Sequence, residues 1–336
     1  MGFTISEAFD HRLTEYQDGP RLLADIGGTN ARFALEYAPG KIGGVHVLKG
    51  ADYPGITDAV AAYLNRLGNP GVRHACMAIA NPVQGDAVRM TNHHWAFSIE
   101  ATRKELNLDT LMAVNDFTAL AMSLPYLGTA DCGKVGGGTA REGKPMGLVG
   151  AGTGLGVGGL VFSGERPIAL ESEGGHATFS PADEKEVAIL EYCWRMHSHV
   201  SAERLVSGPG IELIHRALSA QRGQEAGETM GTPEIIKHAI DGSDPLCVET
   251  IDCFCGMLGT VASNVALTLG ALGGVYIGGG IVPRLGEYFL RSPFRARFEA
   301  KGRFAGYLSE IPTQLITASY PAFYGAAAIL NSRLGK

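Results

Sequence analysis

In the stretch LLADIGGTNARFAL, residues 22–35, two apolar runs flank a turn with two glycines and a Thr–Asn pair. We predict strands at RLLADI and ARFALEY, joined by this turn. Backbone N–H groups in such a turn can converge on a phosphate group, and glycine permits close approach. Taken alone, the stretch is more typical of a plain β-hairpin than of a phosphate site.

The same pattern occurs in the other half of the chain, as GLVGAGTGLGVGGLVF at residues 147–162. Two copies of strand, Gly-Thr turn and strand predict two domains of related design, each with a phosphate loop. Asp25 stands at the end of the first strand, where its carboxylate could hold Mg²⁺ directly or through water. Ala151 is interpreted as its counterpart in the second loop. An asymmetric pair of this kind favours a nucleotide site.

The rest of the chain alternates strands with amphipathic helices, which predicts an α/β fold. Ser98 is placed to cap a helix, and LMAVND predicts a strand that ends at Asn115 and Asp116. A long helix is expected from Pro245 to the C-terminal glycine Gly270. The strand that ends at Asn115 therefore presents two polar side chains at a strand–helix junction.

Composition limits the class of protein. The 336 residues are 45% hydrophobic and 18% charged, which suits about two globular domains. A net charge of -6 without a Lys/Arg-rich run argues against a nucleic-acid partner. We expect neither a signal peptide nor a transmembrane span, and hence no membrane partner. Six cysteines without a CxxC pair predict reduced, mostly buried thiols in a cytoplasmic protein.

Two other glycine motifs are rejected on chemical grounds. Gly138, Gly143 and Lys144 approach a P-loop, but Pro145 stands where that motif needs a Ser or Thr for Mg²⁺. A GxGxxG match begins at Gly154, but a strand is expected after it, where the dinucleotide motif requires a helix.

Taken together, the segments resemble the bacterial glucokinases of the hexokinase superfamily, which have the actin-like ATPase fold. LLADIGGTNARFAL is similar to the first phosphate loop of that family, GAGTGLG to the second, and GGVYIGGGIVP to the adenosine segment. Four further segments are similar to its sugar-site neighbourhood: MTNHHWAFS, NDFTALAMSLP, EGGH and HVSAERLVSGPG. The resemblance extends from about Leu22 to the C-terminus and leaves residues 1–20 outside.

The resemblance implies a fold of the α/β class with two actin-like (ribonuclease H-like) domains and an active-site cleft between them. The last helix would cross back to the first domain, which gives a small discontinuous domain of residues 1–126 plus 318–336. The large domain would be residues 127–317. The implied protein is a cytoplasmic homodimer that phosphorylates D-glucose at the 6-hydroxyl with MgATP and feeds glycolysis.

Site residues are implied by the resemblance one by one. Asp116 would be the catalytic base, and the sugar would be bound by Asn115, Asp116, Glu173, His176 and Glu203. The ATP site would be lined by Ala24, Asp25, Ile26, Gly27, Gly28, Thr29, Gly152, Thr153, Gly154, Gly279 and Gly280. Asp25 would serve Mg²⁺, directly or through water. Carboxylates, an amide and an imidazole suit a ring of sugar hydroxyls.

Each residue also has an ordinary structural alternative. Asp116 could cap the helix that follows it, and Asn115 could be a turn residue. Glu203 could be a first-turn acid favoured by the helix dipole. We interpret His93 and His94 as structural.

Two other functions stay open. A repressor and sugar-kinase family shares the fold and takes glucose, mannose or N-acetylated sugars. Its cysteine-rich zinc motif has no counterpart after His176, so we expect no structural zinc. A non-catalytic actin-like nucleotide-binding protein would need both phosphate loops but not the acid cluster. The sequence does not predict how strictly glucose is preferred, which donor is used or how activity is regulated.

Overall fold

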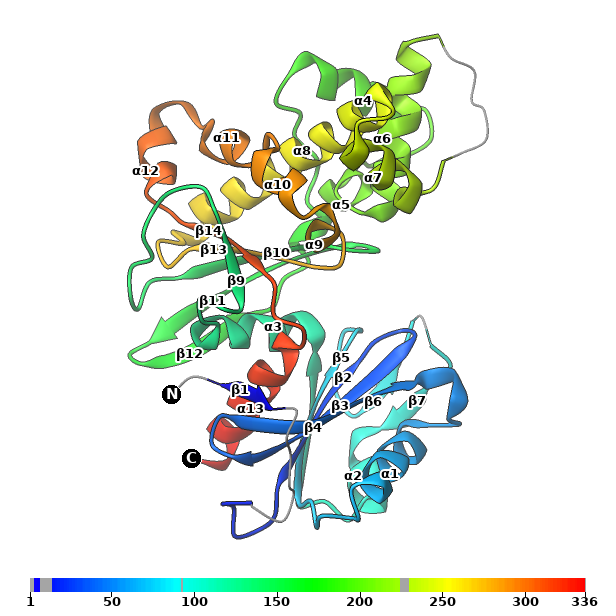
Figure 1. Cartoon of the computed structure of the whole chain (residues 1–336), viewed down its shortest axis with the longest axis vertical. Helices are drawn as coiled ribbons and strands as arrows, with labels where there is room; N and C mark the ends of the chain where they lie inside the picture. Colours follow the sequence, from blue (N-terminus) through cyan, green and yellow to red (C-terminus); the bar gives the residue numbers. More distant parts are fainter. Residues whose placement is uncertain (1–2, 7–13, 92, 224–229, 336) are drawn as a thin grey trace. The chain divides into compact units, whose positions relative to one another are not determined.

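The computed structural model describes residues 3–6, 14–91, 93–223 and 230–335. The chain forms two compact units (Figure 1). Unit 1 comprises Met1–Thr129 and Ala318–Lys336, and unit 2 comprises Ala130–Thr317. The chain therefore leaves unit 1 once, completes unit 2, and returns to unit 1 for its last helix.

Unit 1 is built on a six-stranded sheet in the order β1-β4-β3-β2-β5-β8. The β4-β3-β2 portion is antiparallel, and β2, β5 and β8 run parallel. A small separate hairpin pairs β6 with β7. The strands are β1 (Thr4–Ser6), β2 (Arg21–Ile26), β3 (Asn30–Ala38), β4 (Lys41–Lys49), β5 (His74–Ile79), β6 (Ala87–Arg89), β7 (Ala96–Ser98) and β8 (Thr110–Asn115).

Both faces of this sheet are covered by helices (Figure 1). Side chains alternate along a strand, so Leu22 and Ile26 are buried in the cluster that contains α1, whereas Leu23 is buried with α13. This explains why RLLADI is an almost uninterrupted apolar run. The helices are α1 (Ile56–Arg66) and α2 (Ile99–Glu105) on one face, and α3 (Asp116–Ser123) and α13 (Pro321–Leu334) on the other.

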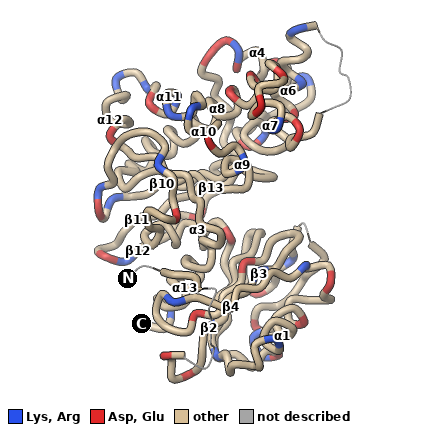
Figure 2. The backbone as a smooth tube through the Cα atoms, viewed as in Figure 1, with Lys and Arg blue, Asp and Glu red and all other residues tan. Residues whose placement is uncertain are grey.

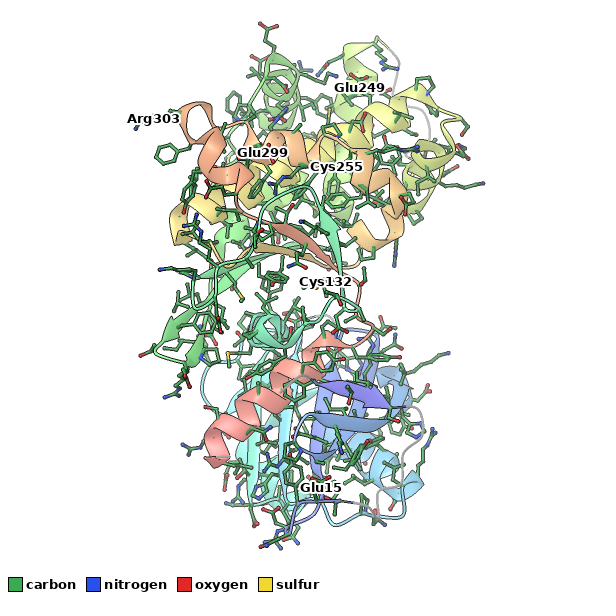
Figure 3. The ribbon with its side chains drawn as sticks, turned by 60° about the vertical axis from the view of Figure 1, so that its left-hand side comes forward. Glu15, Cys132, Glu249, Cys255, Glu299 and Arg303 are labelled. Atoms are coloured by element: carbon green, nitrogen blue, oxygen red, sulfur yellow. The ribbon has the colours of Figure 1, made fainter. Side chains whose placement is uncertain are left out.

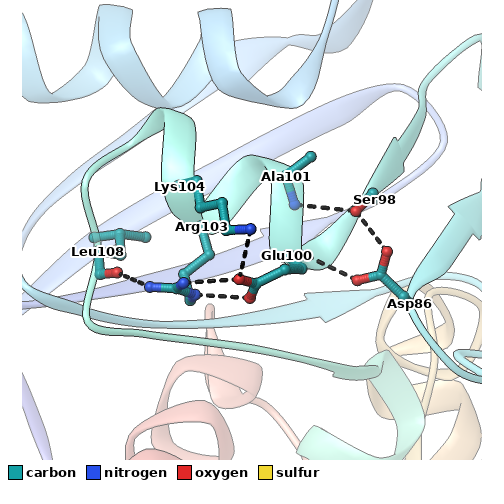
Figure 4. Close-up of polar contacts among 7 residues, drawn as sticks. All are labelled: Asp86, Ser98, Glu100, Ala101, Arg103, Lys104 and Leu108. Atoms are coloured by element: carbon teal, nitrogen blue, oxygen red, sulfur yellow. Dashed lines mark hydrogen bonds and ion pairs between the residues drawn. The ribbon is translucent and has the colours of Figure 1, made fainter.

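The start of α2 follows the predicted cap. The Ser98 hydroxyl oxygen accepts a hydrogen bond from the Ala101 N–H at 3.0 Å (Figure 4). Asp86 accepts from both the Ser98 hydroxyl and the Glu100 N–H, and Arg103 binds Glu100 within the helix. The prediction of a helix begun by Ser98 is confirmed.

Helix α13 packs on α3 through a glycine. A Cβ atom on Gly325 would lie 1.7 Å from the backbone oxygen of Ala119, so only a residue without a side chain permits this approach. The last helix of the chain thereby supports the helix that begins with Asp116.

Unit 2 repeats the strand arrangement of unit 1. Its sheet has the order β12-β11-β10-β13-β14-β9, in which β12-β11-β10 is antiparallel and β10, β13 and β14 run parallel. The prediction of two domains of related design is confirmed at the level of strand order and direction. The strands are β9 (Cys132–Val135), β10 (Met146–Ala151), β11 (Leu155–Ser163), β12 (Arg166–Leu170), β13 (Val275–Gly278) and β14 (Thr313–Ile316).

The helices of unit 2 gather around α8, the longest helix of the described residues. They are α4 (Glu184–Trp194), α5 (Ala202–Leu205), α6 (Gly208–Gln221), α7 (Thr232–Asp241), α8 (Pro245–Leu269), α9 (Val282–Leu285), α10 (Glu287–Arg291), α11 (Phe294–Glu299) and α12 (Ala305–Ser309). Pro245 opens α8 and Gly270 follows it in the left-handed conformation, as predicted. Asp244 caps the helix by accepting from the Leu246 N–H at 2.7 Å.

Helix α8 comes closer in composition to a transmembrane span than the sequence analysis expected of any stretch. Among the described residues it is long and apolar enough to cross a membrane by length and composition, with a window of mean hydropathy 1.4. In the structure 72% of that window is buried within the protein. The helix is apolar on nearly all sides because its neighbours in unit 2 surround it, which is typical of a core helix.

The cysteines are unpaired, and the charged residues of both signs are interspersed (Figure 2). All six cysteines are free; Cys132 lies in β9 and Cys255 in α8 (Figure 3). Burial raises the pKa of the Cys255 thiol to about 12, so it remains protonated. Figure 2 shows Lys and Arg interspersed with Asp and Glu in both units, without a stripe of one sign in that view.

Candidate functional site

The candidate residues of unit 1 lie at one edge of its sheet. Strands β2, β5 and β8 are parallel, with Ile26 paired to Ile79 and Ile79 paired to Asn115. Their carboxyl ends therefore meet at the same edge, where ligands of open α/β sheets bind. This edge brings Asp25 near Asp116, residues that are far apart in the sequence.

Asn115, and not Asp116, caps helix α3. The Asn115 side-chain oxygen accepts from the Phe117 N–H at 2.9 Å and from the Thr118 N–H at 3.3 Å. Its amide group donates to the backbone oxygen of Asn81 at 3.3 Å. The structural alternative for Asp116, that it caps the helix, is therefore wrong.

Asp116 occupies the first turn of α3 with its carboxylate close to the backbone. Its Oδ1 accepts from the Phe117 N–H at 2.8 Å. Burial, together with the negative charge of Asp25, raises the pKa of Asp116 to about 6, although hydrogen bonds to the carboxylate oppose the rise. A carboxyl group with a pKa near neutrality can take up and release a proton at working pH.

Asp25 forms an ion pair across the hairpin. Arg32 donates to Asp25 Oδ2 at 2.8 Å, and the two residues are direct partners in the β2–β3 register. Burial nevertheless raises the pKa of Asp25 above its usual value, although Arg32 lowers it. Arg32 was missed from the sequence, although the antiparallel register of the predicted hairpin could have placed it opposite Asp25.

The turn between β2 and β3 is a β-hairpin turn in geometry. The Gly27 N–H donates to the backbone oxygen of Asn30 at 2.9 Å, and the Thr29 oxygen accepts from the Gly50 N–H at 2.9 Å. Neither Gly27 nor Gly28 has a left-handed backbone. Glycine there leaves room above the backbone and is not required by the backbone angles.

In unit 2, the second glycine turn lies beside the segment predicted to bind adenosine. Strand β10 is parallel to β13, with Gly150 paired to Gly278. Gly279 has φ +86° and its missing Cβ would lie 2.2 Å from the backbone oxygen of Ala151. The Gly152 oxygen accepts from the Gly208 N–H at 2.8 Å, at the start of α6. Residues 152–154 and 279–280 thus converge.

The register corrects the counterpart proposed for Asp25. Ala151 is the last paired residue of β10, as Ile26 is of β2. The residue before it, Gly150, therefore corresponds to Asp25, and its partner Gly156 corresponds to Arg32. The error arose because the first turn has one residue more than the second.

Three predicted sugar-binding residues of unit 2 come together. His176 Nδ1 lies 3.8 Å from Glu203 Oε1, and His176 Nε2 lies 4.0 Å from Glu173 Oε2. The side chains of Glu173 and His176 are largely exposed, at 77% and 60%, whereas that of Glu203 is 33% exposed. The exposed acids and imidazole leave donors and acceptors available to a ligand.

Glu203 is tied to the glycine hairpin of the same unit. Its Oε2 accepts from the Leu155 N–H at 2.9 Å. A Cβ on Gly154 would lie 2.5 Å from that oxygen, and a Cβ on Gly175 would lie 2.0 Å from the backbone oxygen of Leu155. The glycines of GAGTG and EGGH therefore let two loops approach the same strand end.

Asn81, His93 and His94 are polar residues of unit 1 with contacts inside that unit. Asn81 follows β5 at the same edge of unit 1, and its side chain accepts from Thr91 N–H and hydroxyl groups at 3.0 and 2.7 Å. An Asn-Pro pair after a predicted strand was the available signal. The structural interpretation of His93 and His94 agrees with their packing, since His93 contacts the Trp95 ring and His94 Nε2 lies 3.1 Å from the Tyr53 oxygen.

The donor set of unit 1 fits Mg²⁺ beside a phosphate. Arg32 binds Oδ2 of Asp25, so a ligand from this residue would be Oδ1 or a water held by the carboxylate. Oxygen ligands and retained water are what Mg²⁺ prefers.

Comparison with known proteins bears on the same segments. The glucokinase family model matches residues 22–333. The chain is 59% identical over 321 residues to the bifunctional protein glk of Burkholderia pseudomallei. The matched region covers 96% of this chain but 50% of that protein. The chain thus spans about half the length of the first curated relatives it matches. It is 54% identical to a glucokinase of Neisseria meningitidis, with 94% of this chain and 96% of that protein covered.

A crystal structure of glucokinase from an Antarctic psychrotroph superimposes with a TM-score of 0.88 at 35% identity, covering 94% of this chain and all of that chain. The predicted fold, an α/β chain of two actin-like domains, is therefore confirmed. The match of the family model over nearly the whole chain, and the identity to a relative of equal length, lead to one conclusion: the chain belongs to the glucokinase family.

Proposed function

We propose that this chain transfers the γ-phosphoryl group of MgATP to the 6-hydroxyl of D-glucose. The observation that carries the proposal is the Asp116 carboxyl group. Asn115 takes the capping role, so Asp116 is not needed to begin α3, and its pKa of about 6 suits proton transfer. Membership of the glucokinase family supports the substrate and the donor.

The proposed role of Asp116 is that of general base. Its carboxylate would orient the 6-hydroxyl and accept the proton as that oxygen attacks the γ-phosphorus. Positioning and charge stabilisation dominate phosphoryl transfer, and the base typically contributes about 10²- to 10⁴-fold. Burial, and after it the negative charge of the neighbouring Asp25, keeps the pKa of Asp116 high.

The acids of unit 2 and Asn115 of unit 1 would bind the remaining sugar hydroxyls. Glu173 and Glu203 accept hydrogen bonds, and His176 can donate or accept according to its tautomer. A neutral sugar gains from such groups because each hydroxyl can both donate and accept. Rejection of a sugar that lacks a matched hydroxyl follows from the unpaired polar groups it leaves.

The glycine turns would hold the nucleotide through backbone N–H groups. We assign this role to residues 24–29 of unit 1 and to residues 152–154 and 279–280 of unit 2. Mg²⁺, when bound on the Asp25 side, would neutralise charge on the phosphates.

We also propose a cytoplasmic homodimer. Membership of the glucokinase family supports the proposal that the protein is a soluble enzyme. Sedimentation of the purified chain tests whether it is a dimer.

The test is direct. Purified chain is mixed with MgATP and glucose, and glucose 6-phosphate is measured; ATP hydrolysis that no sugar affects would overturn the proposal. The same assay with mannose, fructose and N-acetylglucosamine, compared by kcat/KM, measures strictness for glucose.

The pH profile tests the base separately. Because the base acts in its deprotonated form, kcat/KM should fall about tenfold per pH unit below about 6, the pKa of Asp116. A profile that is flat between pH 5 and 8 would contradict the assignment of Asp116.

A further inference from the structure

A cluster of three different ligand types lies in unit 2, away from the glycine turns. His215 of α6, Asp244 at the start of α8 and Cys247 in the first turn of α8 each offer one ligand atom, and these atoms lie within 4.8 Å of one another. An imidazole nitrogen, a carboxylate oxygen and a thiol sulfur thus converge from two helices. Their separation in the sequence matches no zinc motif, so only the fold reveals them.

The surroundings of these atoms point to a ligand. Among the described residues, His215 Nε2 is buried and has no hydrogen-bond partner. Asp244 uses Oδ1 to accept from the Leu246 N–H. The Cys247 thiol donates to the sulfur of Met230 at 3.6 Å and also interacts with the Asp244 carboxylate, so thiol and carboxylate already face each other. A buried imidazole nitrogen without a partner is unfavourable, and a metal ion is one group that satisfies it.

We propose that His215, Asp244 and Cys247 bind one Zn²⁺ ion. Zinc takes nitrogen, sulfur and oxygen ligands at about 2.0–2.3 Å in a tetrahedron, which places the ligand atoms about 3.3–3.8 Å apart. In the structure the three ligand atoms lie within 4.8 Å of one another, an upper limit about 1 Å longer than this spacing. A hard cation such as Mg²⁺ would not select a thiol and an imidazole, so this site differs chemically from the proposed Mg²⁺ position at Asp25.

The site would connect the helical layer to the glycine turn. Zinc would join the middle of α6 to the start of α8. The Gly208 N–H at the beginning of α6 donates to the Gly152 oxygen, and Thr232 Oγ1 donates to the Gly208 oxygen at 2.8 Å. Bound zinc would therefore stabilise the helix that contacts the turn. The proposed zinc site is not a counterpart of the cysteine-rich zinc motif of the repressor and sugar-kinase family, because that motif is absent after His176 in this sequence.

The experiment uses the full chain without an affinity tag, treated with chelator and dialysed against ZnCl₂. We expect one equivalent of zinc in the wild type and its loss in Cys247→Ser and in His215→Gln. Cys253→Ser is the matched control, since Cys253 lies on the same helix but outside the cluster, and it should retain the zinc. Equal zinc content in the wild type and Cys247→Ser would overturn the proposal.

A spectroscopic measurement keeps the proposal testable if a variant fails to fold. CoCl₂ added to the wild-type chain should give a thiolate-to-cobalt charge-transfer band and the intense visible absorption of a tetrahedral ion. The Cys253→Ser variant should give the same spectrum. A weak octahedral spectrum without the thiolate band would rule the site out.

Discussion

The β2–β3 hairpin of unit 1 and the β10–β11 hairpin of unit 2 have the same place in equivalent sheets but carry charge differently. In unit 1 the paired positions before the turn are Asp25 and Arg32. In unit 2 the equivalent pair is Gly150 and Gly156. Unit 2 instead receives a charge from outside the hairpin, when Glu203 accepts from the Leu155 N–H.

The same backbone arrangement thus carries different side chains in the two units. The sheet edge of unit 1 carries a charged pair within its strands, and there burial, with a smaller contribution from the charge of Asp25, raises the pKa of Asp116. Glycine pairs in unit 2 leave the backbone bare, so that neighbouring loops can approach it closely. On the proposed function, unit 1 supplies the base as well as binding groups, and unit 2 supplies binding groups alone.

The largest expected effect tests this division at Asp116. Asp116→Asn keeps the shape of the side chain but removes the base, so kcat should fall at least 100-fold, equivalent to about 2.7 kcal/mol, while sugar binding is largely retained. Steady-state kinetics and glucose titration measure both. Asp109→Asn is the control, because Asp109 is an exposed partner of Arg73 in the same unit. Near-normal turnover in Asp116→Asn would contradict the assignment of Asp116 as the general base.

The next effect concerns the support of α3 in unit 1. Gly325→Ala places a Cβ against the Ala119 oxygen and should lower the free energy of unfolding by about 1–3 kcal/mol. Gly306→Ala in α12 of unit 2 is the control, because its new Cβ would have no atom within 4 Å apart from its chain neighbours and the backbone of its own helix. Urea unfolding of both variants is the measurement. If the two variants are equally stable, the close approach of α13 and α3 is not what holds unit 1 together.

A smaller effect separates the two hairpins directly. Gly154→Ala would displace the Glu203 carboxylate from Leu155, so kcat/KM for glucose should fall about tenfold or more, since hydrogen bonds to charged groups contribute about 1.5–3 kcal/mol. Gly27→Ala meets its nearest atom, the Asn30 oxygen, at 3.4 Å, so it should change sugar recognition less. An equal loss in both variants would mean that the hairpins do not differ in the way described.

The last effect concerns how Asp116 makes the free energy of unfolding depend on pH. Burial and Asp25 raise the pKa of Asp116 from 3.8 to about 6, so the folded state favours the protonated group and loses stability as pH rises from about 4 to 6. Asp116→Asn removes that cost and should be more stable than wild type at pH 8 by about 1–3 kcal/mol, since each unit of pKa corresponds to about 1.4 kcal/mol. The difference should vanish below about pH 4. Thermal unfolding at several pH values checks the sign, which would be opposite if the carboxylate stabilised the fold.

Local rules predicted the elements whose ends are set by single residues. Pro245 marks the start of α8 because a proline suits the first turn of a helix but not its interior. Gly270 marks the end because it adopts φ +61°. RLLADI forms β2 as predicted because both faces of its sheet are buried. By contrast, β4 was missed because glycines interrupt its KIGGVHVLK pattern, and α6 was missed because its opening GPG is typical of a turn.

The residues of the candidate site could be predicted from the sequence only in part. Residues near strand ends, such as Asn115 and Asp116, follow from the strand pattern and the family resemblance. The ion pair of Asp25 with Arg32 depends on register, and a turn longer by one residue was enough to misplace the counterpart of Asp25. The cluster of His215, Asp244 and Cys247 depends on how two helices pack, which no spacing in the sequence encodes.

The return of α13 to unit 1 has a consequence for biosynthesis. Residues 130–317 must emerge from the ribosome before the helix that covers Leu23, Cys76 and α3 exists, which takes roughly 10–40 s at 5–20 residues per second. Throughout that interval one apolar face of the unit 1 sheet lacks its cover. Nascent chains shorter than about 334 residues should therefore bind chaperones and lack phosphotransfer activity, however well unit 2 has folded.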